Sequence, residues 1–145
     1  MRFYCPNCWS DFAEDMRRCP QCGQDIPAFL KEKDYVERLI VALNHPEPET
    51  PMRAAWILGQ LRDERAVEPL INLLGSTQDV YIARAVVEAL DQIGTPRALE
   101  VLSAVADSHP ADMVRERARA AVTKKPDNPP ATPEGDIAGI DTNRR

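Results

Sequence analysis

Apolar residues with helical spacing recur along this chain every 31 or 32 residues, and this internal repeat restricts its fold more than any other feature. Apolar side chains at i, i+3, i+4 and i+7 line one face of a helix. A first helix with this pattern is expected three times, at Val36, Leu39, Ile40 and Leu43, at Val67, Leu70, Ile71 and Leu74, and more weakly at Leu99, Leu102, Ser103 and Ala106.

A second helix is expected after each first one. Its apolar residues are Ala54, Ile57, Leu58 and Leu61, then Val86, Ala89, Leu90 and Ile93, then Ala118, Ala121 and Val122. A simple bundle needs amphipathic helices, but only a stack of like units also needs matching residues at a constant spacing. The sequence therefore predicts a mainly α fold, with a short α-solenoid of about three antiparallel helix pairs over residues 34–123.

Residues that begin and end helices agree with this repeat. Asp34 with Glu37 resembles a capping box, and the pairs Thr50-Pro51 and Thr95-Pro96 place a capping residue before a proline at the first helical position. Gly75 and Gly94 are expected helix ends. Pro69 is disfavoured inside a helix, so the helix near Ala66 is expected to begin late, with Pro69 in its first turn.

Residues 52–74, Met-Arg-Ala-Ala-Trp-Ile-Leu-Gly-Gln-Leu-Arg-Asp-Glu-Arg-Ala-Val-Glu-Pro-Leu-Ile-Asn-Leu-Leu, resemble the HEAT-like repeat first noted in phycobilisome lyases. Residues 80–106 and 111–123 resemble it more loosely. The resemblance implies a right-handed stack of antiparallel helix pairs whose second helices line a concave face. The Val-Arg pair that opens the second helix in this family is present as Val114-Arg115, and it implies a bonding role for Arg115.

Four cysteines are spaced C-x2-C-x10-C-x2-C, at Cys5, Cys8, Cys19 and Cys22. Two tight knuckles can present four thiolates to one tetrahedral ion, and four protein ligands leave no open position for catalysis. We therefore expect one structural zinc ion in a module of residues 1–26, which is otherwise too short to bury a core. Residues 3–26 also resemble small bacterial and archaeal zinc ribbons.

Other interpretations of the cysteines remain open. The same ligands can hold iron as in rubredoxin, and two disulfides or a thioredoxin-like redox pair are further alternatives. Gly23 follows the second knuckle, but Trp9 takes the same place in the first. Because tryptophan adopts left-handed backbone poorly, either the first knuckle is strained or Trp9 closes over the metal.

The sequence offers little chemistry outside the cysteines. His45 and His109 each precede a proline between two helices and are expected to be solvent-exposed loop residues. The chain has no His-Glu pair of the kind used by di-metal hydroxylases with HEAT-like repeats, and it has no P-loop, dinucleotide fingerprint or nucleophile elbow. We therefore expect no enzymatic activity.

The expected function is a protein–protein interaction adaptor or scaffold. Aligning the second helices places Trp56 at an outward position, and the candidate partner-binding patch is Met52, Arg53, Trp56, Arg84 and Glu88. The alternative for Trp56 is packing against residues 26–30 or the zinc module. Arg115, Glu116, Arg117 and Arg119 are expected to form a polar cap on the last helix.

Two further functions are weaker hypotheses. Zinc ribbons often bind nucleic acid, and Arg17-Arg18 lie between the knuckles, but residues 34–123 carry nine basic and fourteen acidic groups, opposite to a phosphate-binding surface. A regulatory subunit of an enzyme is a special case of the adaptor. A monomer or weak homodimer is expected.

The remaining expectations concern boundaries and location. Residues 27–33 are predicted to be a linker, and residues 124–145, rich in proline, a disordered tail. No apolar segment follows Arg2, and no window approaches the roughly 18 apolar residues of a membrane span. No membrane partner is therefore expected, and a cytoplasmic location is the default.

Overall fold

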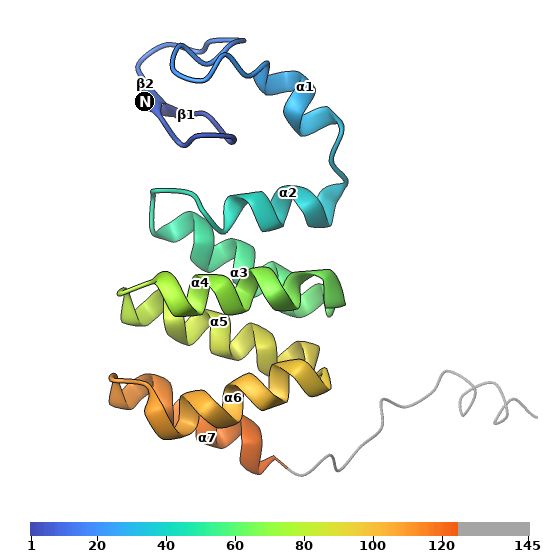
Figure 1. Ribbon diagram of the computed structural model, residues 1–145, viewed down its shortest axis with the longest axis vertical. Helices are drawn as coiled ribbons and strands as arrows, with labels where there is room; N and C mark the ends of the chain where they lie inside the picture. Colours follow the sequence, from blue (N-terminus) through green and yellow to red (C-terminus); the bar gives the residue numbers. More distant parts are fainter. Residues whose placement is uncertain (125–145) are drawn as a thin grey trace, which may run out of the picture.

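The computed structural model describes residues 1–124, and these form a small N-terminal module followed by three stacked helix pairs (Figure 1). The prediction of a disordered tail concerns residues outside this part, apart from Lys124. The elements are β1 (Phe3–Tyr4), β2 (Asp11–Phe12), α1 (Ile26–Lys31), α2 (Tyr35–Ala42), α3 (Glu49–Leu61), the 3-10 turn η1 (Glu64–Ala66), α4 (Val67–Ser76), α5 (Val80–Ile93), α6 (Pro96–Ser108) and α7 (Asp112–Thr123). The predicted mainly α solenoid of three helix pairs is confirmed.

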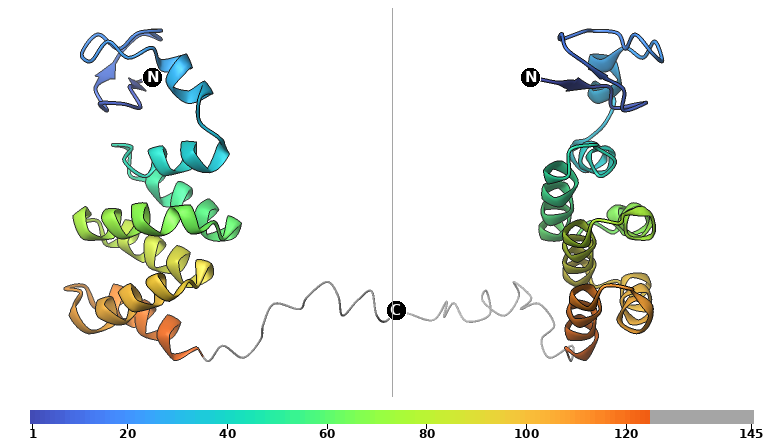
Figure 2. Two further views of the ribbon diagram at one scale, coloured as in Figure 1. Left: turned by 45° about the vertical axis from the view of Figure 1, so that its right-hand side comes forward. Right: turned by 90° about the vertical axis from the view of Figure 1, so that its left-hand side faces the viewer.

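The helices form two layers. The first helices α2, α4 and α6 lie on one side of the stack, and the second helices α3, α5 and α7 lie on the other (Figure 2). Second helices pack directly on one another, α3 on α5 and α5 on α7, whereas α4 and α6 touch only sparsely. The layer of first helices is therefore the more open of the two.

One apolar core runs through the stack between the layers. Its largest fully buried side chains include one from each helix from α3 to α7, namely Leu58, Leu70, Leu90, Leu102 and Val114. Gly59 lets α3 and α5 approach closely, because a Cβ there would lie 2.9 Å from the Cα of Ala89. The close contact between second helices therefore depends on a residue without a side chain.

Most predicted helix ends are confirmed. The carboxylate of Asp34 accepts the N–H of Glu37 at 2.9 Å, the hydroxyl of Thr95 accepts that of Ala98, and Gly94 ends α5 with φ +67°. Helix α4 begins at Val67, so Pro69 lies in its first turn as expected.

Two predicted helix ends are wrong. Helix α3 begins at Glu49, one residue before Thr50, and has no side-chain cap. Helix α4 continues past Gly75 to Ser76, and Thr77 follows in extended conformation. Pro48 has helical backbone, so α3 can begin directly after it, and Gly75 stays helical, so α4 continues to Ser76. Neither residue forces the helix to begin or end at the predicted position.

The prediction of an apolar face on the first helix of the third pair, now α6, is correct in part. Leu102 and Ala106 are buried, but Leu99 is 42% exposed and Ser103 is also exposed. The residue 32 positions before Leu99 is Val67, which is only 5% exposed. Equivalent positions of the repeat are therefore buried to different extents in different pairs.

The predicted polar cap is also correct in part. Glu116 and Arg119 are exposed, but Arg117 pairs with Asp91 at 3.0 Å and with Glu88 at 3.5 Å. Arg115 donates to the carbonyl of His109 at 2.6 Å, which confirms the bonding role implied by the family resemblance. These two arginines therefore join α7 to its neighbours instead of covering it.

A side chain in the loop of each pair holds the start of the second helix. Glu47 and Ala111 donate their N–H groups to the Nδ1 atoms of His45 and His109, at 3.0 and 3.1 Å. Asp79 donates in the same way to the hydroxyl of Thr77 at 3.1 Å. His45, Thr77 and His109 are spaced by 32 residues, so these bonds are part of the repeat, and the expectation of two exposed histidines is wrong because both are half-buried.

The predicted linker, residues 27–33, lies mostly in helix α1. The side chain of Asp25 caps this helix by accepting the N–H of Ala28. Arg38 of α2 donates to the carbonyls of Leu30 and Lys33 at 2.9 and 3.1 Å, which ties α1 to the first pair. No helix within residues 1–124 has the length and apolar character needed to cross a membrane.

Candidate metal centre and interaction face

Two knuckles with the same backbone geometry form the N-terminal module. In residues 5–10 and again in 19–24, the N–H of the first cysteine donates to the carbonyl five residues later, and its carbonyl accepts from the residue four later, at 2.8–3.0 Å. Strand pairing flanks the first knuckle at Tyr4 and Asp11, and a β-bridge flanks the second at Arg18 and Asp25. The two halves of the C-x2-C pattern thus fold alike.

The knuckles bring all four predicted ligands together. The sulfurs of Cys5, Cys8, Cys19 and Cys22 lie within 4.8 Å of one another, and Cys5–Cys22 and Cys8–Cys19 are each 3.6 Å apart. Sulfurs at 2.3 Å from a tetrahedral ion are about 3.8 Å apart. The four cysteines are free thiols and so form no disulfide, and they could hold one metal ion.

The pKa values of three of the thiols are shifted, two of them in the direction that favours the thiolate. Burial raises the pKa of Cys5 to about 11, whereas the hydroxyl and then the backbone of Ser10 lower the pKa of Cys8 to about 6. The side-chain amide of Asn7 lowers the pKa of Cys22, 3.6 Å from its sulfur. A cation deprotonates coordinating thiols, so it would overcome the effect of burial at Cys5.

Trp9 takes a conformation that is unusual for its residue type. Its φ is +62°, close to the +75° of Gly23 at the same place in the second knuckle. A left-handed residue with a side chain costs about 1–2 kcal/mol. The first knuckle is therefore strained, as one of the two interpretations of the sequence holds, and the strain orients the indole ring.

The module packs on the first helix pair through this ring. The imidazole of His45 lies edge-on to Trp9, with ring centroids 5.3 Å apart, and to Tyr4 at 4.7 Å. The hydroxyl of Tyr4 donates to Glu47 at 2.7 Å. His45 is therefore a docking residue, and no signal in the sequence pairs it with Trp9.

The candidate partner patch lies on the second helices. Met52, Arg53 and Trp56 belong to α3, and Arg84 and Glu88 to the neighbouring α5, where they form an ion pair of 3.3 Å. Trp56 is 60% exposed, so neither residues 26–30 nor the cysteine module covers it. The two helices pack together, which places both halves of the patch on one layer.

The sequence prediction missed one exposed aromatic residue of this layer. Tyr81, in the first turn of α5, is 67% exposed. Aligning the second helices at a spacing of 32 residues could have identified Tyr81. This alignment matches it to Glu49 and Met113, which also lie in the first turns of their helices. The second-helix face therefore carries two large exposed aromatic rings.

The basic pair between the knuckles is only partly available. Arg17 forms an ion pair with Asp25 at 3.1 Å, and Arg18 lies 3.5 Å from the carbonyl of Gly23. Both side chains are exposed residues of the module, but the ion pair neutralises Arg17. This arrangement presents little net positive charge.

Comparison with known proteins agrees with the helix stack. A search of curated proteins finds no match. The sequence model of HEAT repeats matches residues 36–123, more than half of the chain, from α2 to the end of α7. The chain therefore belongs to the family of HEAT repeats.

Proposed function

We propose that this protein is a non-catalytic interaction adaptor, in which a partner protein binds the second-helix face of the HEAT stack. The exposed Trp56 is the observation that carries this proposal. Large exposed aromatic residues and arginines dominate the energetics of protein interfaces, and HEAT-type stacks present extended binding surfaces. The free thiols of the module are in keeping with a reducing, cytoplasmic setting.

The partner patch is proposed to be Met52, Arg53, Trp56, Arg84 and Glu88. Arg53 is exposed and makes no ion pair within residues 1–124, so it can pair with a carboxylate of the partner. Glu88 is already held by Arg84 and Arg117, so it orients those side chains. This distribution favours a partner segment with an apolar residue for Trp56 and an acidic one for Arg53.

The cysteine module is proposed to be a zinc ribbon with one structural zinc ion. Zinc favours four thiolates in tetrahedral geometry, and the four sulfurs have the spacing that this geometry needs. The metal would supply the folding energy of a module that has almost no core. Cys5, Cys8, Cys19 and Cys22 would occupy all four positions, so the ion would have no place for a substrate.

The adaptor role is tested by affinity enrichment from the native host with two matched variants. Trp56→Ala removes the exposed ring of the patch, and Leu61→Ala removes a similarly exposed apolar side chain at the end of the same helix. We expect Trp56→Ala to reduce recovery of a specific partner about tenfold, while Leu61→Ala has little effect. Both should keep the unfolding midpoint of the wild type.

Two outcomes would contradict this role. Loss of stability in Trp56→Ala would mean that the ring supports the fold instead of a partner. Tight, salt-dependent binding of nucleic acid, lost on substitution of Arg17 and Arg18, would mean that the module binds phosphates.

A further inference from the structure

The loops of the first and third helix pairs contain the same His-Pro turn with the same hydrogen bond. His45-Pro46 and His109-Pro110 are separated by two repeats of 32 residues, and both imidazoles accept a backbone N–H through Nδ1. In the second pair Thr77 makes this bond with its hydroxyl. The bond therefore does not require an imidazole ring. An imidazole ring at these two positions can make ring contacts that a threonine side chain cannot make.

At His45 the added role of the ring is visible. The module lies on the side of the first pair that faces away from the second pair (Figure 1). From that side Tyr4 and Trp9 place their rings edge-on to the imidazole. The first His-Pro turn thus binds aromatic side chains of the N-terminal module.

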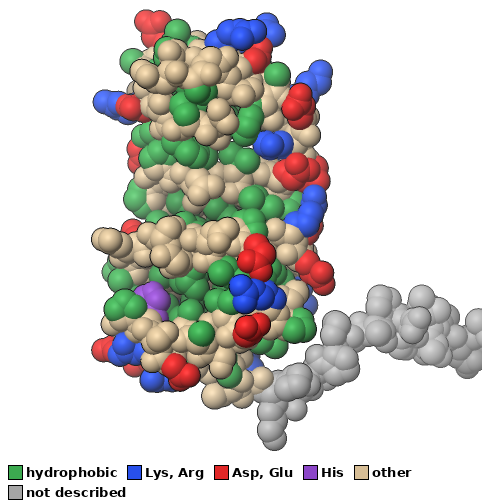
Figure 3. All heavy atoms as spheres, viewed as in Figure 1, with side chains coloured by type: hydrophobic (Ala, Val, Ile, Leu, Met, Phe, Trp, Pro, Cys, Tyr) green, Lys and Arg blue, Asp and Glu red, His purple; other side chains and the backbone are tan. Residues whose placement is uncertain are grey.

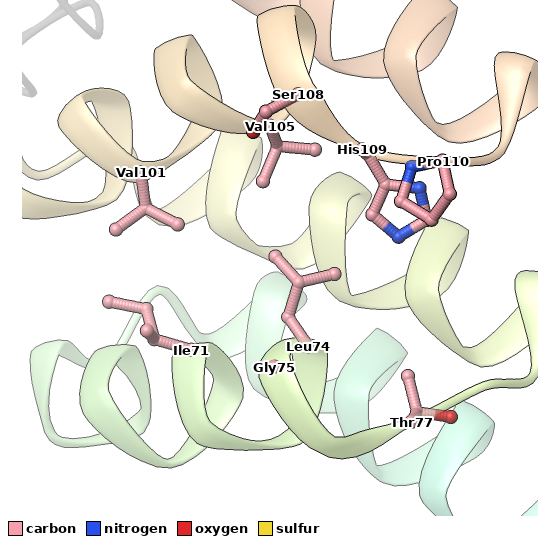
Figure 4. Close-up of a pocket in the computed structure, with 9 residues that line it drawn as sticks. All are labelled: Ile71, Leu74, Gly75, Thr77, Val101, Val105, Ser108, His109 and Pro110. Carbon is pink, nitrogen blue, oxygen red and sulfur yellow. The ribbon is translucent and has the colours of Figure 1, made fainter.

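At His109 the corresponding side faces a cavity. The cavity measures about 410 Å³ and lies between α4 and α6, on the side of the third pair that faces the second. Figure 4 shows Ile71 and Leu74 of α4 opposite Val101 and Val105 of α6, with His109 at one end. Hydrophobic side chains are also visible in the hollows between the helices of this layer in Figure 3.

The lining of this cavity favours an uncharged side chain. Among the described residues that line it there is no acidic residue, lysine or arginine, and four of the nine are the aliphatic residues Ile71, Leu74, Val101 and Val105. A second cavity of about 340 Å³ adjoins it, because both are lined by Thr77, His109 and Pro110. The second cavity is also lined by Asp79, whose carboxylate accepts the N–H groups of Tyr81 and Ile82. The two cavities together provide a groove that is longer than one side chain, so an extended segment can follow its ring into it.

We propose that the groove at His109 binds an aromatic side chain, above all tryptophan, carried by an extended segment of a partner protein. Trp9 and Tyr4 contact His45, and two repeats later His109 lines an equivalent site that no residue of the described chain fills. Because Nδ1 of His109 accepts a hydrogen bond, the neutral ring carries its proton on Nε2. This N–H can donate to a carbonyl of the partner backbone.

The test is an NMR titration of the full, metal-loaded chain with the peptide acetyl-Gly-Trp-Gly-amide and the matched acetyl-Gly-Leu-Gly-amide. The chain has only two histidines, so the ring signals of His109 and His45 serve as probe and internal control. We expect saturable shifts at His109 and at the methyl groups of Val101 and Val105, with the signals of His45 unchanged. The tryptophan peptide should bind about fivefold more tightly than the leucine peptide.

Three variants sharpen the result. His109→Thr copies the bond that Thr77 makes, so it should keep the unfolding midpoint but lose the preference for tryptophan over leucine. Val105→Glu places a charge in the cavity and should abolish binding of both peptides, whereas Ser103→Glu, on the same helix but outside the lining, should not.

Several results would overturn the proposal: no saturable shift at His109, equal affinity for both peptides, or full tryptophan preference in His109→Thr. The experiment does not involve Trp56, which lies on the other layer of helices. Failure here therefore leaves the adaptor role of the second-helix face standing, and loss of that role leaves this site standing.

Discussion

The indole ring of Trp9 and the imidazole ring of His45 pack edge-on, with their planes at 68°, although 36 positions separate the two residues in the sequence. This contact joins the cysteine module to the helix stack. The strained φ of Trp9 aims the ring at His45, so the geometry of the first knuckle and the docking of the module are coupled. The coupling predicts how the protein responds when either side of the contact is removed.

Metal removal should undock the module while the stack stays folded. In Trp56→Phe the only remaining tryptophan is Trp9, so its fluorescence reports on the contact with His45. A strong chelator should shift its emission to the red, because the knuckle that orients the ring would lose the proposed zinc ion. Far-UV circular dichroism should retain most of the helical signal of residues 34–123. An unchanged emission maximum after complete metal removal would show that the module docks without metal.

His45→Thr should weaken docking without disturbing the loop. Threonine can accept the N–H of Glu47 as Thr77 accepts that of Asp79, but it offers no ring to Trp9. We expect the module to lose about 1 kcal/mol of docking free energy, seen as faster proteolysis within residues 26–34. The equivalent His109→Thr serves as control and should leave the cleavage rate in this segment unchanged. Equal rates in wild type and His45→Thr would contradict the prediction.

Gly59→Ala should destabilise the stack by about 1–3 kcal/mol, because the new methyl group would press on the backbone of α5 at Ala89. Gly75→Ala is the matched control: it also lies in a helix, but an added Cβ meets nothing within 4 Å. That change should be neutral or stabilise by about 0.5–1 kcal/mol. Urea unfolding followed by circular dichroism measures both, and similar effects of the two substitutions would refute the close approach.

Arg65→Met should lower stability at neutral pH, and the difference from wild type should vanish in acid. Hydrogen bonds from Arg65 lower the pKa values of Asp34 and Asp63. A carboxylate with a lowered pKa in the folded state adds stability above its unfolded pKa, near 3.9, and loses it as pH falls through the folded value. The effect is small because Arg65 and Asp34 are exposed to solvent and Asp63 is only half-buried.

The free energy of unfolding of Arg65→Met and wild type is therefore compared from pH 7 down to pH 2. Arg119→Met, at an exposed arginine that makes no ion pair within residues 1–124, controls for loss of a positive charge. A difference that stays constant below pH 3 would assign the effect of Arg65 to packing.

The sequence alone determined the architecture and the convergence of the four cysteines. The constant spacing from Val36 to Val67, and from Leu58 to Leu90, predicted the helix pairs because each unit of a stack buries the same positions. The spacing of the cysteines predicted their convergence, because a tight C-x2-C turn places two sulfurs on the same side by local geometry alone.

Only the tertiary structure decided which surfaces are covered. Leu99 and Val67 hold equivalent places in the repeat, yet one is exposed and the other buried, because burial depends on the neighbours that each helix has in the stack. Arg117, expected to be a surface cap, reaches Asp91 on a neighbouring helix. The packing of Trp9 against His45 likewise depends on the path of residues 26–34. Local propensity and periodicity determine helices and knuckles, but contacts between distant segments depend on how those units meet in space.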